Sequence, residues 1–192
     1  MKTLRHLLEG SRQTIMASWH ETVFRVYLAD TARFLKHEPD PFANPVGQTT
    51  SRALEPLWDH LVTGSDRSDA MPFIDDLMRI RAVQRIEPSE ALSFLFSLKQ
   101  IVREQLGVHS LDRGLLEEVL TFETRIDDLA LSAFNSYLAC RERLSEIRAM
   151  ELRGRSERVL AELNRRLARK SDEAPSDPPD LEGDRSERGD TT

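Results

Sequence analysis

Cysteine is nearly absent from the sequence, and so are the short motifs that hold a metal ion or a phosphate group. The single cysteine, Cys140, excludes an intramolecular disulfide and a cysteine-based zinc site. The eight glycines form neither of the glycine-rich loops that cradle phosphates. The histidines lack the spacings of zinc-protease and di-iron sites. They are His6, His20, His37, His60 and His109. We therefore expect no catalytic, cofactor-binding or metal-binding residues, and no enzymatic activity.

Long apolar runs are also absent. The longest uncharged stretch that could be helical, Leu129 to Cys140, has 12 residues, whereas a membrane-spanning helix needs about 20 apolar ones. The first six residues have neither a continuous apolar core nor a small-residue cleavage site, so they do not resemble a secretory signal. We expect a soluble, cytoplasmic protein that does not span a membrane.

The charges that are present are unevenly distributed. The 192 residues carry a net charge of −6, which argues against a nucleic-acid binder. Residues 141–170 hold ten basic and five acidic side chains, whereas residues 171–192 hold two basic and eight acidic ones. Residues 171–192 also contain three prolines and one large apolar residue, Leu181. This composition cannot bury enough apolar surface to offset its ordering entropy, and it predicts a disordered acidic tail.

The remaining sequence has helical periodicity almost throughout, and no segment shows the alternation of a strand, so the predicted fold class is all-α. Asn44 followed by Pro45 predicts a helix start, and Gly64 predicts its end. A helix is expected over about 70–85, and another begins at Pro88 and ends near Gly107. The inward side chains of the 70–85 helix are expected to be Phe73, Leu77, Ile80 and Val83.

Residues 115 to about 170 contain no proline and only one glycine, Gly154, which predicts one very long helix or two in line. Apolar or small residues recur along it at a mean spacing of 3.5, the period of a coiled-coil seam. The predicted seam comprises Val119, Phe122, Ile126, Leu129, Ala133, Tyr137, Cys140, Leu144 and Ile147.

A second apolar stripe lies on an adjoining face of the same helix. It comprises Leu116, Leu120, Ala130, Phe134 and Leu138. Two stripes indicate that the helix packs on its own domain with one face and on another molecule with the other. A twin subunit is the simplest partner, because two-fold homodimers are the commonest oligomers. We expect the 3.5-spaced seam to be the dimer interface; the alternative is that both stripes are intramolecular core.

Two arginines are the only candidates for a ligand contact. Arg79 can pair with Asp75 one helical turn earlier. Arg81 stands next to the apolar Ile80 and could bind an internal carboxylate or an anionic ligand. Structural ion pairing is the simpler interpretation of both residues.

Several segments resemble the N-terminal domain of the RsbR (RsbRD) family of bacterial stress-signalling regulators. They are Phe42-Ala43-Asn44-Pro45-Val46-Gly47-Gln48-Thr49, Arg79-Ile80-Arg81-Ala82-Val83-Gln84, Pro88-Ser89-Glu90-Ala91-Leu92 and Phe122-Glu123-Thr124-Arg125-Ile126-Asp127-Asp128-Leu129-Ala130. The resemblance covers roughly residues 3–165. It implies a globin-like helical domain without haem, a homodimer formed through the last helices, and a long helix that passes a signal to a partner protein.

The chain departs from the full-length family pattern, because nothing after residue 170 could be a STAS domain. We expect a stand-alone module with a globin-like domain over 1–140, a protruding helix or weak coiled coil over 141–170, and an acidic tail over 171–192. The expected function is a non-enzymatic sensor or adaptor that acts as a homodimer and binds a protein partner through 141–170.

Two other functions remain open at this point. One is an accessory protein that docks on a membrane respiratory redox complex through 141–170. The other is a globin-like sensor of haem or a small ligand. The segment from Pro88 to Leu106 contains no histidine that could serve as a proximal haem ligand, which argues against haem.

Overall fold

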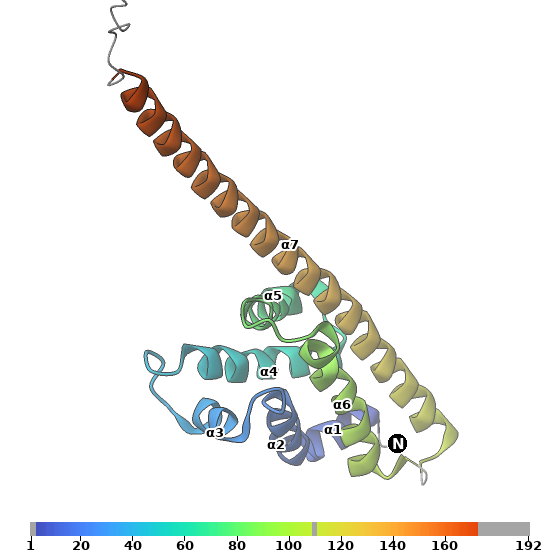
Figure 1. Ribbon diagram of the computed structural model, residues 1–192. Coiled ribbons are helices and arrows are strands. Elements are labelled where there is room, and N and C mark those ends of the chain that lie inside the picture. Colours follow the sequence, from blue (N-terminus) through green and yellow to red (C-terminus); the bar gives the residue numbers. More distant parts are fainter. Residues whose placement is uncertain (1–2, 109–110, 173–192) are drawn as a thin grey trace, which may run out of the picture. The chain divides into compact units, whose positions relative to one another are not determined.

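The computed structural model describes residues 3–108 and 111–172, and these residues form seven α-helices and no strand. The all-α prediction is therefore confirmed for this part of the chain. The helices follow the order α1 (Leu4–Gly10), α2 (Arg12–Val23), α3 (Ala29–His37), α4 (Pro45–Thr63), α5 (Arg67–Val83), α6 (Pro88–Leu106) and α7 (Arg113–Asp172), as Figure 1 shows. The predicted acidic tail lies outside the described residues from position 173 onward.

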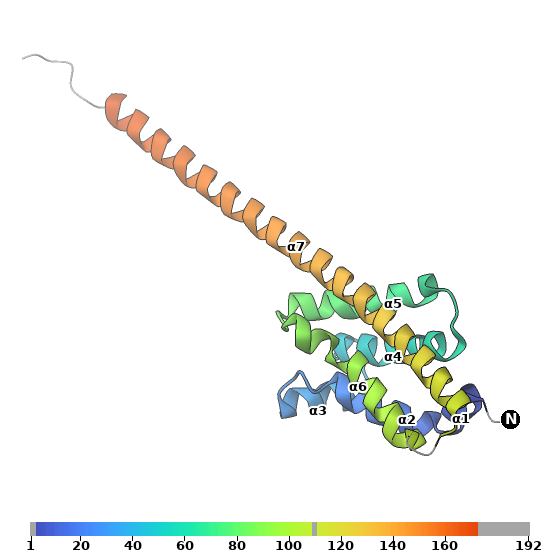
Figure 2. The ribbon, with the colours of Figure 1, turned by 90° about the vertical axis from the view of Figure 1, so that its right-hand side faces the viewer.

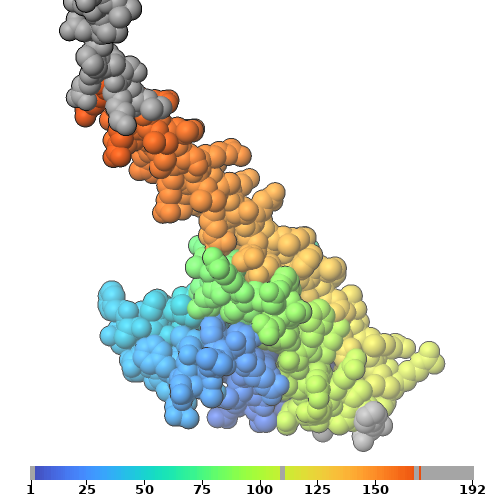
Figure 3. Space-filling model, viewed as in Figure 1, coloured from blue at the N-terminus to red at the C-terminus, as the bar shows by residue number. Residues whose placement is uncertain are grey.

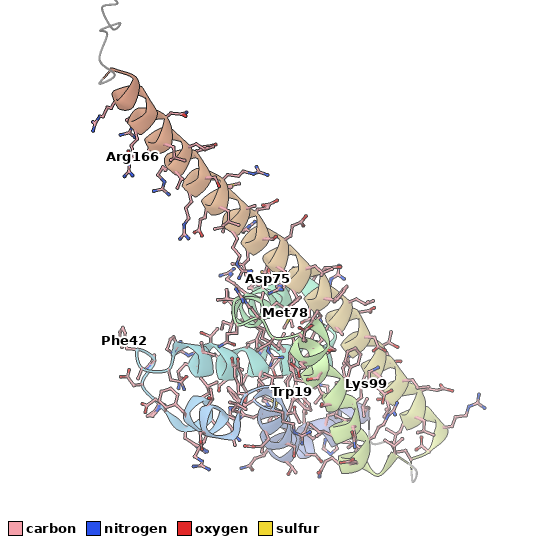
Figure 4. All side chains as sticks on the ribbon, in the orientation of Figure 1. Trp19, Phe42, Asp75, Met78, Lys99 and Arg166 are labelled. Atoms are coloured by element: carbon pink, nitrogen blue, oxygen red, sulfur yellow. The ribbon has the colours of Figure 1, made fainter. Side chains whose placement is uncertain are left out.

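The chain divides into two units, Met1–Glu146 and Ile147–Thr192, and α7 contributes to both. In unit 1, α2 lies beside α6 and α4 lies beside α5 (Figures 1 and 2). The core between these helices contains both tryptophans, Trp19 and Trp58. The indole N–H of Trp19 donates to the carbonyl of Phe94 at 2.9 Å, and this bond joins α2 to α6. Figure 4 shows Trp19 among the helices and Phe42 at the outer tip of the α3–α4 turn.

Local sequence signals explain where α4 and α6 begin and end. The Asn44 side chain accepts the N–H of Gly47 at 2.8 Å, and Pro45 occupies the first turn of α4. Gly64 and Gly107 end α4 and α6 in the left-handed conformation, with φ of +67° and +57°. The helix starts and stops predicted at these positions are confirmed.

The predicted inward face of α5 is wrong. Phe73 and Ile80 are half-buried and Val83 is 56% exposed, so only Leu77 of the predicted set lies in the core. The side chains that α5 buries are Ala70, Ile74, Leu77, Met78, Arg81 and Ala82. Because this face includes an arginine, its position cannot be read from apolar periodicity alone.

Candidate interaction surface

The predicted dimer seam lies inside the single subunit, and that prediction is corrected here. Six of its nine side chains are at most 3% exposed, namely Val119, Phe122, Ile126, Leu129, Ala133 and Tyr137. Cys140 and Leu144 are half-buried and pack against the same core. Only Ile147, the first residue of unit 2, is largely exposed. A spacing of about 3.5 residues occurs both in coiled coils and in helices that pack on their own domain. The spacing alone therefore does not distinguish a dimer interface from an intramolecular core.

Specific contacts fix this face of α7 against unit 1. The ring of Phe122 meets that of Trp58 edge-on, with centroids 6.4 Å apart. The hydroxyl of Tyr137 donates to the carbonyl of Ile86 at 2.5 Å. Arg125 donates to the carbonyl of Leu61 at the end of α4. The first part of α7 is thus an integral core helix, and its buried stripe is not accessible to a second subunit.

A different apolar stripe of α7 faces outward. Leu120 and Leu131 are 62% and 65% exposed, and Phe134 and Leu138 are 40% and 45% exposed. Three of these residues belong to the second stripe expected from the sequence, whereas its other members, Leu116 and Ala130, are half-buried and buried. Sequence reasoning missed Leu131, although its spacing of three residues from Phe134 and seven from Leu138 was a usable signal.

This outward stripe borders a groove between α6 and α7. The groove has a volume of about 740 Å³ and is lined mainly by apolar side chains. Its residues are Pro88, Ser89, Leu92, Phe96, Asp127, Ala130, Leu131 and Phe134. Phe96, which is 51% exposed, was also missed, because the apolar run around it predicts a fully enclosed helix. Exposed aromatic and aliphatic side chains that gather in one groove are typical of a binding surface.

Ion pairs hold α6 to α7, one at the edge of this groove and one farther along the two helices. The ammonium of Lys99 lies 2.6 Å from the carboxylate of Asp127, and Figure 4 labels Lys99 on the side of α6 toward α7. Arg103 makes two hydrogen bonds of 2.6 Å to Glu123, whose carboxylate raises the pKa of that guanidinium. Figure 3 shows the surfaces of α6 and the first turns of α7 next to each other. The two helices therefore present one joint, preformed face.

The two arginines singled out from the sequence occupy very different places. Arg79 is exposed and lies 3.3 Å from Asp76, not from the predicted partner Asp75. The carboxylate of Asp75 instead accepts the hydroxyl of Ser136 on α7 at 2.7 Å. The structure does not bring Arg79 and Arg81 together at one site.

Arg81 is 1% exposed. Its guanidinium donates to the carbonyls of Val23, at 2.9 Å, and Ala91, and it lies 4.7 Å from the ring centroid of Phe94. Burial opposes the charged form and lowers the pKa of Arg81 to about 10. These partners belong to α2 and α6, so within the described residues Arg81 connects three helices.

The part of α7 in unit 2 is exposed on nearly every side. Its exposed large apolar side chains are Ile147, Met150, Leu152, Val159, Leu160 and Leu163. Arginines are interspersed with them, and those from Arg148 to Arg158 are all exposed. Glu162 pairs with Arg165 and Arg166 within this segment, at 3.7 and 3.0 Å. The segment is therefore a basic helix with uncovered apolar side chains.

No group of three or more metal-ligating side chains occurs in residues 3–108 and 111–172. None of the helices over those residues is sufficiently long and apolar to cross a bilayer.

Two of the histidines contact serine hydroxyls. His20 on α2 lies within hydrogen-bond distance of Ser51, and His60 on α4 lies within hydrogen-bond distance of Ser65.

Comparison with known proteins places most of the chain in one family. The model of the RsbT co-antagonist protein rsbRD N-terminal domain matches residues 16–152. An uncharacterized protein of Archaeoglobus fulgidus is 31% identical over 87 residues, which are 45% of this chain. The chain spans about half, 52%, of the length of that curated relative. No solved structure matches the chain significantly.

Proposed function

The chain belongs to the RsbRD N-terminal domain family, and on that premise we propose that it is a non-enzymatic signalling module that acts as a homodimer. In this proposal the twin subunit binds the α6–α7 face, defined by the groove residues together with Leu120 and Leu138. The basic distal segment of α7, residues 147–169, binds a partner protein. The observation that carries the proposal is the uncovered apolar groove between α6 and α7.

The composition of the α6–α7 face supports a second copy as its occupant. Phe96, Leu131 and Phe134 are large apolar side chains that lose solvent exposure when a similar surface covers them. The rim carries Lys99 and Asp127, which pair with each other and leave no excess of one charge. Two identical faces of this kind can meet about a two-fold axis without repulsion between like charges.

The spacing of apolar residues along α7 adds to this argument. Leu131, Leu138, Leu152 and Val159 are separated by multiples of seven residues. Residues at that spacing fall on one side of a helix in a coiled coil. The outward stripe thus has the same heptad period as the predicted seam, and its side chains are exposed in the part of the chain that the structure describes.

Light scattering and sedimentation at tens of micromolar test the homodimer. We expect the wild-type protein to be a dimer and Leu131→Glu to be a monomer, because dimerisation would bury an unpaired carboxylate. Leu28→Glu is the matched control, since Leu28 is 83% exposed and lies away from the α6–α7 face. A monomeric wild-type protein, or a dimeric Leu131→Glu variant, contradicts the proposal.

The charge of the distal segment points to an acidic partner surface. Residues 147–169 hold seven basic and three acidic side chains, and complementary charge steers association. Glutamine replacement of Arg148, Arg153, Arg155 and Arg158 should weaken capture of a co-purified partner at low salt. Glutamine replacement of Arg5 and Arg33 in unit 1 is the control. Equal capture by both variants would contradict this contact.

A further inference from the structure

The turn between α4 and α5 forms a small pocket against α7 that contains several basic side chains. The pocket has a volume of about 280 Å³, and every residue that lines it belongs to unit 1. Arg67 contributes from the start of α5, Arg125 and Asp128 from α7, and His60 and Ser65 from the end of α4 and the turn. It lies apart from the α6–α7 groove and shares no lining residue with it.

Arg125 is held at this pocket by backbone contacts. Its Nη1 donates to the carbonyl of Leu61 at 2.9 Å. Gly64 makes the close approach possible, because a Cβ at that position would lie 2.9 Å from the Cζ and Nη2 atoms of Arg125. Among the described residues, the Nε and Nη2 groups of Arg125 have no hydrogen-bond partner. The guanidinium is thus fixed in place while its Nε and Nη2 groups remain available to donate to a ligand.

Arg67 is the second arginine of the pocket. Its Nη1 donates to the hydroxyl of Ser132 at 3.3 Å. Over residues 3–108 and 111–172, neither Arg67 nor Arg125 has a carboxylate within 4.0 Å. The nearby carboxylate of Asp66 already accepts the backbone N–H of Ser68, a bond that lowers its pKa. Two guanidinium groups in one pocket, neither of which is in an ion pair among the described residues, favour an oxyanion.

Asp128 narrows the choice of oxyanion. Its carboxylate lines the same pocket and has no ion-pair partner in the part of the chain that the structure describes. An ionised carboxylate only accepts hydrogen bonds, so it repels a fully deprotonated anion and favours one that carries an O–H. Inorganic phosphate keeps at least one proton near neutral pH. Sulfate has none, and a phosphate monoester loses its last proton near pH 6.

We propose that this pocket binds inorganic phosphate, with Arg67 and Arg125 donating to its charged oxygens and Asp128 accepting its P–OH hydrogen. The inference deepens the proposed function and rests on it, because it names the chemical class of the signal. Two of the three binding residues belong to α7, the helix assigned to the dimer and partner contacts. Phosphate at this turn bridges α5 and α7, so it adds to the hydrogen bonds that Arg67 and Asp75 already make to α7.

Calorimetric titration of the full chain, at constant ionic strength in chloride, tests the site with phosphate, sulfate and glycerol 2-phosphate. We expect saturable binding of phosphate and at least tenfold weaker binding of the other two anions. Arg67→Gln should weaken phosphate binding at least tenfold, while Arg79→Gln, an exposed arginine on the same helix, should leave it unchanged. Asp128→Asn should remove the preference for phosphate over sulfate.

Absence of saturable phosphate binding by the wild-type protein overturns the proposal, and so does equal affinity for sulfate. Equal affinities of Arg67→Gln and Arg79→Gln for phosphate overturn it as well. Arg67→Gln isolates the phosphate contact better than Arg125→Gln, because Arg125 also holds α7 to the carbonyl of Leu61. Sedimentation of the same samples separates the two proposals. A monomer that binds phosphate refutes only the dimer, and a dimer that does not bind phosphate refutes only the site.

Discussion

Burying the guanidinium of Arg81 in the core of unit 1 costs desolvation free energy. Hydrogen bonds to backbone carbonyls, not ion pairs with carboxylates, offset that cost. Val23 is the last residue of α2, so its carbonyl has no acceptor role within that helix. Arg81 supplies the missing donor. The lowered pKa of Arg81 reflects the opposing cost of desolvation. The residue therefore stabilises the junction of α2, α5 and α6 only as long as all of its hydrogen bonds are kept.

Replacing Arg81 with methionine keeps an apolar stem but removes these donors. We expect Arg81→Met to lower the free energy of unfolding by about 1–3 kcal/mol, because a buried carbonyl is left unsatisfied. Urea unfolding measures the change. Arg79→Met is the control and should stay within about 0.5 kcal/mol of the wild type, since its side chain is exposed. An equally stable Arg81→Met protein would mean that the relief of desolvation outweighs the lost bonds.

His20 makes the stability depend on pH. Burial is the main reason that its pKa lies below the usual value of 6.5. The unfolded chain therefore takes up a proton first as the pH falls through about 6.5, so unfolding becomes more favourable on the acidic side. His20→Gln should reduce the loss of stability between pH 7.5 and pH 5.5, measured by urea unfolding. His6→Gln, at an exposed position on α1, serves as the comparison. An unchanged pH dependence in His20→Gln would rule out this assignment.

At the scale of helices, the sequence predicts boundaries better than faces. Asn44, Pro45, Gly64 and Gly107 determine the ends of α4 and α6 through local backbone chemistry, which a sequence displays directly. The face that a helix buries depends on what other helices bring to it. On α5 the inward face includes Arg81, which apolar periodicity excludes. On α7 both apolar stripes were recognisable, but only the folded unit shows which stripe the core covers.

The two faces of α7 differ in a way that mutation can measure. Leu129→Ala should lower the free energy of unfolding by about 2–5 kcal/mol, because Leu129 is 1% exposed and the change leaves a cavity. Leu131→Ala, at a position 65% exposed, should change it by no more than about 0.5 kcal/mol. Dilute protein in the urea titration minimises any contribution from association. Equal losses at both positions would contradict the assignment of the two faces.

At the scale of the whole molecule, unit 1 has a packed core, whereas the described part of unit 2 is an exposed helix. Removing residues 147–192 should leave the thermal midpoint of unit 1 within a few degrees of the full chain, because among the described residues the core side chains all precede position 147. Circular dichroism at 222 nm checks the midpoint and should also show the loss of helix signal from the removed part of α7. A truncated protein that fails to fold would show that unit 1 depends on the distal segment.

Both tryptophans of the chain lie in the core and are at most 1% exposed. Intrinsic fluorescence is therefore a built-in optical probe of unit 1 alone, with blue-shifted emission in the native protein and a red shift on denaturation. Binding of a second subunit to the outer surface of α6 and α7 should leave that emission unchanged, because neither indole is exposed at that surface. Fluorescence can thus follow folding while sedimentation follows association, and neither measurement needs an added label.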